Sequence, residues 1–155
     1  MLYIDLDLHH GDGVEAEFLK LRQVVTLSLH HFSDGFYPGT GSMCHPGNCI
    51  NVPLPEKVGD DDWTELANFA VTKAVDSFDP DFIVVQCGAD SLFNDPHKTL
   101  CISQTAYFNV LARIKRFGKP TLVLGGGGYN EVATAKLWPR VNIILDSHNN
   151  RKYII

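Results

Sequence analysis

The chain has 155 residues, 45% of them hydrophobic and 20% charged, and these values predict a single soluble globular domain. Thirteen Lys and Arg against eighteen Asp and Glu give a net charge of -5 without a basic stripe, which argues against direct nucleic-acid binding. No apolar run approaches the roughly 18 residues of a membrane span, and the N-terminus has no signal-peptide pattern. Because the four cysteines also lack CxxC spacing, we expect a reducing compartment, the nucleus or the cytoplasm.

In chain order, the spacing of apolar residues predicts four strands that alternate with four helices. Short alternating or β-branched runs predict strands at Leu2–Leu8, Val24–Leu29, Phe82–Val85 and Thr121–Leu124. Helical spacing predicts helices at Val14–Leu21, Trp63–Phe78, Ser103–Phe117 and Glu131 to about Ile144, with Pro139 expected to kink or shorten the last one. This alternation is typical of an α/β protein whose parallel sheet carries helices on both faces.

The segment from Ser33 to Gly59 contains many prolines and glycines and has little periodicity. It therefore predicts a long surface loop, a kind of segment that often carries function. In open α/β sheets, ligands bind outside the carboxyl ends of the strands. Three polar motifs of this sequence follow predicted strands, and they are the candidates for a functional site.

The first motif places Asp5, Asp7 and His9 at a spacing of two, so their side chains are expected on one face near the end of the first strand. Burying three ionisable groups together is costly unless a cation or hydrogen bonds compensate, which favours a metal site. Zinc suits carboxylate and imidazole ligands, and Asp90, which follows the third predicted strand, could be the third ligand. The alternative is that these groups cap helices or line a polar edge, as Asp12 could do for the helix near Val14.

The second motif follows the last predicted strand, where four glycines at 125–128 precede Tyr129. Glycines allow a ligand to approach the backbone closely. Phosphate binding is disfavoured, because the run lacks the G-x-G-x-x-G pattern with a downstream acid and lacks a Lys-Ser/Thr pair. Tyr129 could donate a hydrogen bond to a developing oxyanion, although without the other motifs it would more often be an aromatic packed on the sheet.

Four segments in this order resemble class I histone deacetylases. They are Tyr-Ile-Asp-Leu-Asp-Leu-His-His-Gly-Asp-Gly at 3–13, Gly-Phe-Tyr-Pro-Gly-Thr-Gly at 35–41, Gln-Cys-Gly-Ala-Asp-Ser-Leu at 86–92 and Leu-Gly-Gly-Gly-Gly-Tyr-Asn at 124–130. The resemblance extends from about residue 2 to about residue 138. It implies a three-layer, arginase-like α/β fold and zinc-dependent hydrolysis of acetyl-lysine in histones or other proteins, in the service of transcription and chromatin regulation.

The resemblance also implies roles for single residues. Asp7, His9 and Asp90 match zinc ligands, and Tyr129 matches the phenol that polarises the acetyl carbonyl. The positions that match a potassium site are Asp5, Asp7, His9, Ser28 and Leu29. Tyr37, where the family usually has Phe, and Gly127 match the wall of the substrate channel.

Members of the family carry a Gly-Gly-Trp-His-His-type segment before the first motif, and these 155 residues contain none. We therefore expect residues 1–155 to be a partial catalytic domain without the histidine pair that Asp5 and Asp12 would orient. Asp95-Pro96 resembles the branch of the family that works without a large corepressor. For Cys87, a buried and inert thiol is favoured over a redox-sensitive one.

Two alternatives to the deacetylase interpretation remain open at this point. One is a truncated, catalytically weak isoform that acts as a binding or dominant-negative partner. The other is an arginase-type or acetylpolyamine hydrolase with the same fold, which the deacetylase-like motifs disfavour.

Overall fold

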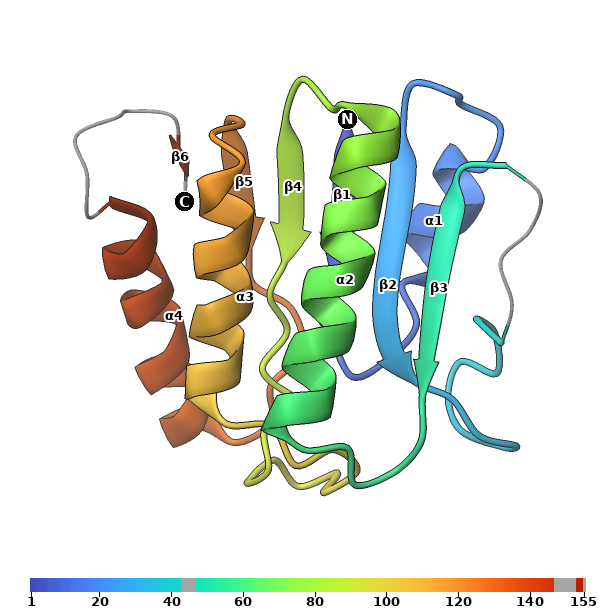
Figure 1. Cartoon of the computed structure of the whole chain (residues 1–155). Coiled ribbons are helices and arrows are strands. Elements are labelled where there is room, and N and C mark those ends of the chain that lie inside the picture. Colours follow the sequence, from blue (N-terminus) through green and yellow to red (C-terminus); the bar gives the residue numbers. More distant parts are fainter. Residues whose placement is uncertain (43–46, 147–152, 155) are drawn as a thin grey trace.

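The computed structural model describes residues 1–42, 47–146 and 153–154, and within them it contains one six-stranded sheet in which every pairing is parallel (Figure 1). The strands lie in the order β3-β2-β1-β4-β5-β6. Their bounds are β1 Leu2–Asp5, β2 Val25–His31, β3 Cys49–Leu54, β4 Ile83–Gln86, β5 Thr121–Leu124 and β6 Tyr153–Ile154. The predicted α/β class with a parallel sheet is confirmed.

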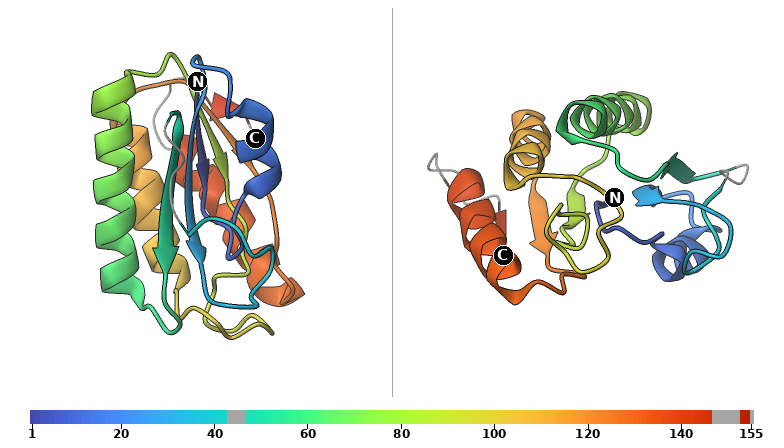
Figure 2. Two further views of the ribbon diagram at one scale, coloured as in Figure 1. Left: turned by 90° about the vertical axis from the view of Figure 1, so that its right-hand side faces the viewer. Right: turned by 90° about the horizontal axis from the view of Figure 1, so that it is seen from below.

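Helices cover both faces of this sheet, as expected. Their bounds are α1 Asp12–Phe18, α2 Asp60–Phe78, α3 Gln104–Arg116 and α4 Glu131–Asp146. Helices α2 and α3 lie side by side on one face, α1 lies against the opposite face, and α4 packs alongside α3 near β5 and β6 (Figure 2). None of the helices in the described part of the chain is long and apolar enough to cross a membrane.

The order of the strands creates a switch point between β1 and β4. From β1 the chain continues outward through β2 to β3, whereas β4, on the other side of β1, leads outward through β5 to β6. In the register of the sheet, Asp5 at the end of β1 lies opposite Gln86 at the end of β4. The loops that follow these two strands therefore leave the sheet side by side, which is where α/β proteins most often bind ligands.

The hydrophobic core fixes the position of these two loops. Trp63 of α2 and Tyr107 of α3 are fully buried, with ring centroids 5.0 Å apart. The Tyr107 hydroxyl group contacts two backbone oxygens, those of Gly88 at 2.6 Å and of Leu6 at 3.2 Å. A core side chain thus ties the loop after β1 to the loop after β4.

The first strand is shorter than predicted, and hydrogen bonds explain why. The expected strand Leu2–Leu8 ends at Asp5, while Leu6 and Leu8 remain fully buried. The Leu6 N–H still bonds to the Gln86 carbonyl of β4 at 3.0 Å, but the next two N–H groups bond to carboxylates: that of Asp7 donates to Asp5 Oδ1 at 3.0 Å, and that of Leu8 to Asp90 Oδ1 at 2.8 Å. The prediction that three polar side chains share one strand face is therefore wrong, because only Asp5 lies on the strand.

Two further predictions need correction. The expected loop Ser33–Gly59 contains strand β3, which pairs with β2 at the edge of the sheet, a position where Pro53 is tolerated. Helix α4 is not shortened by Pro139 but continues to Asp146. Strand β6 was not predicted either, and the remaining helices and strands agree with their predicted ranges to within three residues.

Candidate metal centre

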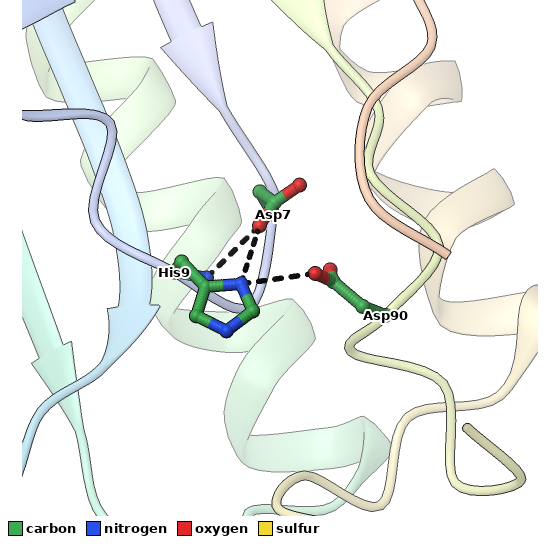
Figure 3. Close-up of side chains that lie close together, drawn as sticks. All are labelled: Asp7, His9 and Asp90. Atoms are coloured by element: carbon green, nitrogen blue, oxygen red, sulfur yellow. Dashed lines mark hydrogen bonds and ion pairs between the residues drawn. The ribbon is translucent and has the colours of Figure 1, made fainter. Parts of the chain in front are cut away.

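Three predicted metal ligands, Asp7, His9 and Asp90, come together at the switch point of the sheet (Figure 3). His9 Nδ1 lies 3.1 Å from Asp7 Oδ1 and 3.1 Å from Asp90 Oδ2. One potential ligand atom from each residue lies within 4.8 Å of the other two. Asp7 and His9 come from the loop after β1 and Asp90 from the loop after β4, so the fold joins two segments about 80 residues apart in sequence.

Neighbouring polar groups hold both carboxylates in place. Oδ2 of Asp7 accepts hydrogen bonds from Gln86 Nε2 and from the backbone N–H of Gly127, each at 2.9 Å. Gln86 is itself fixed, because its Oε1 accepts from the Gly88 backbone N–H at 2.8 Å. One oxygen of Asp7 is thus engaged by the protein, which leaves Oδ1 directed at His9.

Burial and hydrogen bonding shift the pKa values of the cluster in different directions. Burial alone would raise the pKa of Asp7, but the hydrogen bonds from His9, Gln86 and Gly127 outweigh it and lower this pKa. Burial, with nearby Asp7, raises the pKa of Asp90. Hydrogen bonds to Asp7 and Asp90 raise the pKa of His9 to about 9. The two carboxylates therefore favour a positive charge at the position between them.

The cluster fits a zinc ion. Two carboxylates and one imidazole form a three-ligand set of the kind found in catalytic zinc sites, where one position stays open for water or substrate. Asp90 is 1% and Asp7 7% exposed, so the protein blocks one side, and the partly buried His9 lines a cleft on the other. A cation would compensate for the buried carboxylates.

Protein carboxylates approach two glycines of the site closely, whereas the approach of a ligand to the glycine run stays a prediction. A Cβ at Gly127 would lie 2.2 Å from Asp90 Oδ2 and 3.0 Å from Asp7 Oδ2, and one at Gly88 would lie 2.1 Å from Asp7 Oδ2. The distances of 2.1 and 2.2 Å are too short for any side chain at these positions unless the aspartate moves. These glycines are thus required by the packing of the candidate ligands.

The cluster opens into a cleft of about 460 Å³ that also contains Tyr37, His97, Gly127 and Tyr129. Two larger hollows, of 630 and 610 Å³, lie elsewhere on the protein, and none of the three candidate ligands lines them. The donor atoms, and not the volume of the cavity, therefore identify the site. Tyr129 is 58% exposed, and partial burial together with nearby carboxylates raises its pKa, which keeps the phenol protonated as a hydrogen-bond donor. The structure therefore brings Tyr37, Gly127 and Tyr129 to the metal cluster, as predicted.

The residues that match a potassium site lie on the adjoining strands. Asp5 pairs with Ser28 in the register of β1 and β2, and both are buried, as is Leu29. Burial raises the pKa of Asp5 to about 7. Asp12, by contrast, is an exposed residue in the first turn of α1, and Gly11 rather than Asp12 is the N-cap. Its suggested role in orienting a histidine pair stays a prediction.

Several residues of the site were not identified from the sequence. Gln86 contacts Asp7, the ring of Phe36 stacks on that of His9 at 5.4 Å, and His97 contacts both His9 and Tyr129. Gln86 and Phe36 lie within the motifs at 86–92 and 35–41, and the position of Gln86 at a strand end is the one signal that could have identified it. The remaining contacts depend on loop conformations that have no sequence pattern.

Comparisons of the sequence with known proteins find a matching domain model and several relatives. A sequence model described as the histone deacetylase domain matches residues 1–145. The chain is 40% identical over 154 residues to histone deacetylase 9 of Arabidopsis thaliana, covering 95% of this chain and 36% of that protein. It is 37% identical over 151 residues to histone deacetylase 8 of Xenopus laevis, covering 94% and 46% of the two proteins. It is 40% identical over 144 residues to histone deacetylase 8 of Danio rerio, covering 89% and 38%. The chain thus spans less than half the length of these relatives.

Proposed function

The chain belongs to the histone deacetylase domain family, and from this premise we propose that it contributes the metal centre of a zinc-dependent lysine deacetylase. The substrates would be acetyl-lysine side chains of histones or other proteins. The observation that carries the proposal is the convergence of Asp7, His9 and Asp90, of which Asp7 and His9 line the same cleft as Tyr129.

In this proposal each residue has a chemical task. Asp7, His9 and Asp90 hold the zinc, which when bound supplies a Lewis acid for a carbonyl oxygen. Tyr129 donates a hydrogen bond from its protonated phenol to the same oxygen, and this bond strengthens as negative charge develops there. Tyr37 and Gly127 line the cleft and orient the acyl group.

We also propose that potassium binds near Asp5, Ser28 and Leu29. The support is a buried carboxylate whose pKa burial raises to about 7, next to a buried serine on the adjacent strand. A monovalent cation would favour the charged carboxylate. Titrating potassium against sodium should stabilise the wild-type chain but not Asp5→Asn, and equal responses of the two chains would contradict the potassium site.

The first test of the zinc proposal measures metal and activity together in the 155-residue chain. We expect about one zinc per folded chain by elemental analysis, and slow release of acetate from an acetyl-lysine peptide, because these residues lack the family's histidine-pair segment. A hydroxamate, which chelates zinc, should inhibit this release. Asp90→Asn preserves the shape of the side chain but removes a charged ligand, so zinc and activity should both be lost. Asp81→Asn, at an exposed aspartate just before β4, is the matched control and should retain both.

The two parts of the proposal fail in different ways. A folded chain that binds no zinc would contradict the metal site. A folded, zinc-loaded chain that releases no acetate would contradict deacetylation by these residues. Circular dichroism of each variant identifies losses that come from unfolding.

The cellular part of the proposal is action on acetylated histones or other proteins in the nucleus and cytoplasm, in transcription and chromatin regulation. It is supported by the names of the relatives, which are those of histone deacetylases. Fluorescence microscopy of the tagged protein, together with acetyl-lysine proteomics after its depletion, tests this part. A protein excluded from both compartments, or unchanged acetylation, would contradict it.

A further inference from the structure

His97 lies in the cleft, but no step of the proposed reaction uses it. Its ring centroid is 5.2 Å from that of His9 and 4.9 Å from that of Tyr129, and both contacts are edge-on. In the proposed reaction, the substrate carbonyl would lie between His9, one of the residues that would hold zinc, and the hydroxyl group of Tyr129. An acyl group in that position would therefore lie next to the imidazole of His97.

Asp95 determines how this imidazole presents its nitrogens. Asp95 is 1% exposed, and its Oδ1 lies 2.8 Å from His97 Nδ1 and accepts from the His97 backbone N–H at 3.0 Å. Its Oδ2 accepts from the Tyr129 backbone N–H at 2.8 Å. A carboxylate can only accept, so Nδ1 carries a proton, and in the neutral ring Nε2 is then a hydrogen-bond acceptor.

The second nitrogen of His97 is available to a ligand. In the described part of the chain, both ring nitrogens are engaged by protein groups in three buried histidines: His10, His30 and His31. For His97 the structure gives a partner to Nδ1 alone, and the side chain is 34% exposed and lines the cleft. A histidine that only supports the fold would be expected to use both nitrogens, as the other three do.

We propose that His97 is a specificity-determining residue that accepts, through Nε2, a hydrogen bond from the N–H of the substrate's secondary amide. This inference rests on the proposed function and adds a substrate preference to it. An acetylated amine has the required N–H, whereas an acetate ester of the same shape has an oxygen there and cannot donate. The site would therefore favour secondary amides over esters.

Two matched peptides test this preference. One contains acetyl-lysine and the other the acetate ester of 6-hydroxynorleucine, which differs by O in place of N–H. Their affinities for the zinc-loaded chain are measured by displacement of a fluorescent hydroxamate, which does not depend on turnover, and kcat/KM is compared as well.

His97→Leu should weaken binding of the amide peptide about tenfold and leave the ester peptide unchanged, as loss of one hydrogen bond predicts. His97→Gln offers an acceptor oxygen and should restore part of the amide preference. Lys98→Leu, at an exposed side chain of the same loop, should alter neither affinity.

The outcomes separate this inference from the one on which it rests. A wild-type chain that binds no hydroxamate would overturn the proposed function and this inference with it. A chain that binds hydroxamate but shows the same amide preference with and without His97 would overturn the role of His97 alone. Equal weakening of both peptides in His97→Leu would indicate a packing role and would also overturn it.

Discussion

At the scale of single residues, His9 links the electrostatics of the cluster to metal uptake. Its hydrogen bonds to Asp7 and Asp90 raise its pKa to about 9, so the ring is protonated at neutral pH, yet zinc requires the neutral form. We expect zinc binding at pH 7 to release at least one proton, and affinity to fall by about tenfold per pH unit as the pH drops below 9. Calorimetry in buffers with different ionisation enthalpies measures this release, and a binding heat independent of the buffer would contradict it.

Gly127 connects the glycine run to the metal ligands. Gly127→Ala places a Cβ that must displace Asp90, so we expect zinc affinity to fall by about 10- to 100-fold, as for other changes that misorient ligands. Gly13→Ala is a suitable control, because a Cβ at that helical position meets no atom within 4 Å. Competition with a chelating indicator gives both affinities. Wild-type affinity in Gly127→Ala would show that the carboxylate can move freely.

Cys87 and Cys101 should react very differently with thiol reagents. Cys87 is fully buried, and burial raises its pKa to about 12, whereas Cys101 is exposed. The thiolate is the reactive form, so iodoacetamide should label Cys101 first and reach Cys87 only on unfolding. Peptide mass spectrometry resolves the two sites, and early labelling of Cys87 would revive a redox role. Cys44 lies outside the described residues.

Some site residues could be predicted because the residues next to them in the sequence form a recognisable pattern. Asp7 and His9 were recognisable because they alternate with buried leucines, and Asp90 because it follows an apolar strand. Asp95 and His97 gave no such signal. Their importance arises from one carboxylate that contacts both the His97 ring and the backbone of Tyr129, 34 residues away.

At the scale of helices and strands, Ser103 and Asp60 connect the starts of two helices. Ser103 caps α3 by accepting from the Thr105 backbone N–H, and its own hydroxyl and backbone N–H donate to the carboxylate of Asp60 in the first turn of α2. Ser103→Ala should lower the free energy of unfolding by about 1–2 kcal/mol. Ser77→Ala, at an exposed position of α2, should change it by less than about 0.5 kcal/mol.

Chemical denaturation followed by circular dichroism compares these two variants. A Ser103→Ala chain as stable as Ser77→Ala would contradict the capping role. The cap lies within the predicted helix Ser103–Phe117, but its contact with the start of α2 was not predictable, because nothing in the sequence specifies that α2 and α3 are neighbours.

Periodicity predicted where most elements occur but failed where polar contacts decide. Strand β1 ends early because carboxylates take the N–H groups of Asp7 and Leu8. Strand β3 was missed because its one proline and the prolines and glycines around it resemble a loop, although an edge strand pairs on only one side and tolerates proline.

At the scale of the whole molecule, the order of the strands explains the site. The sequence predicted parallel strands but not that β1 lies between β2 and β4. This order places the loops after β1 and β4 together, and it brings the loop after β5 next to them through the bond from Gly127 to Asp7. The site is therefore a product of topology acting on three separate motifs.

Hydrogen bonds from backbone N–H groups to carboxylates join the three loops around the site. Leu8 is tied to Asp90 and Gly127 to Asp7, so two of the side chains that would receive the metal also fasten the three loops to one another, and Asp95 adds a bond to Tyr129. The pocket is in this sense preorganised, and little chain entropy remains to be lost when an ion enters. Zinc should then raise the melting temperature through mass action while the far-UV spectrum of the native chain stays the same, the behaviour of a receptor that is complete before its ligand arrives.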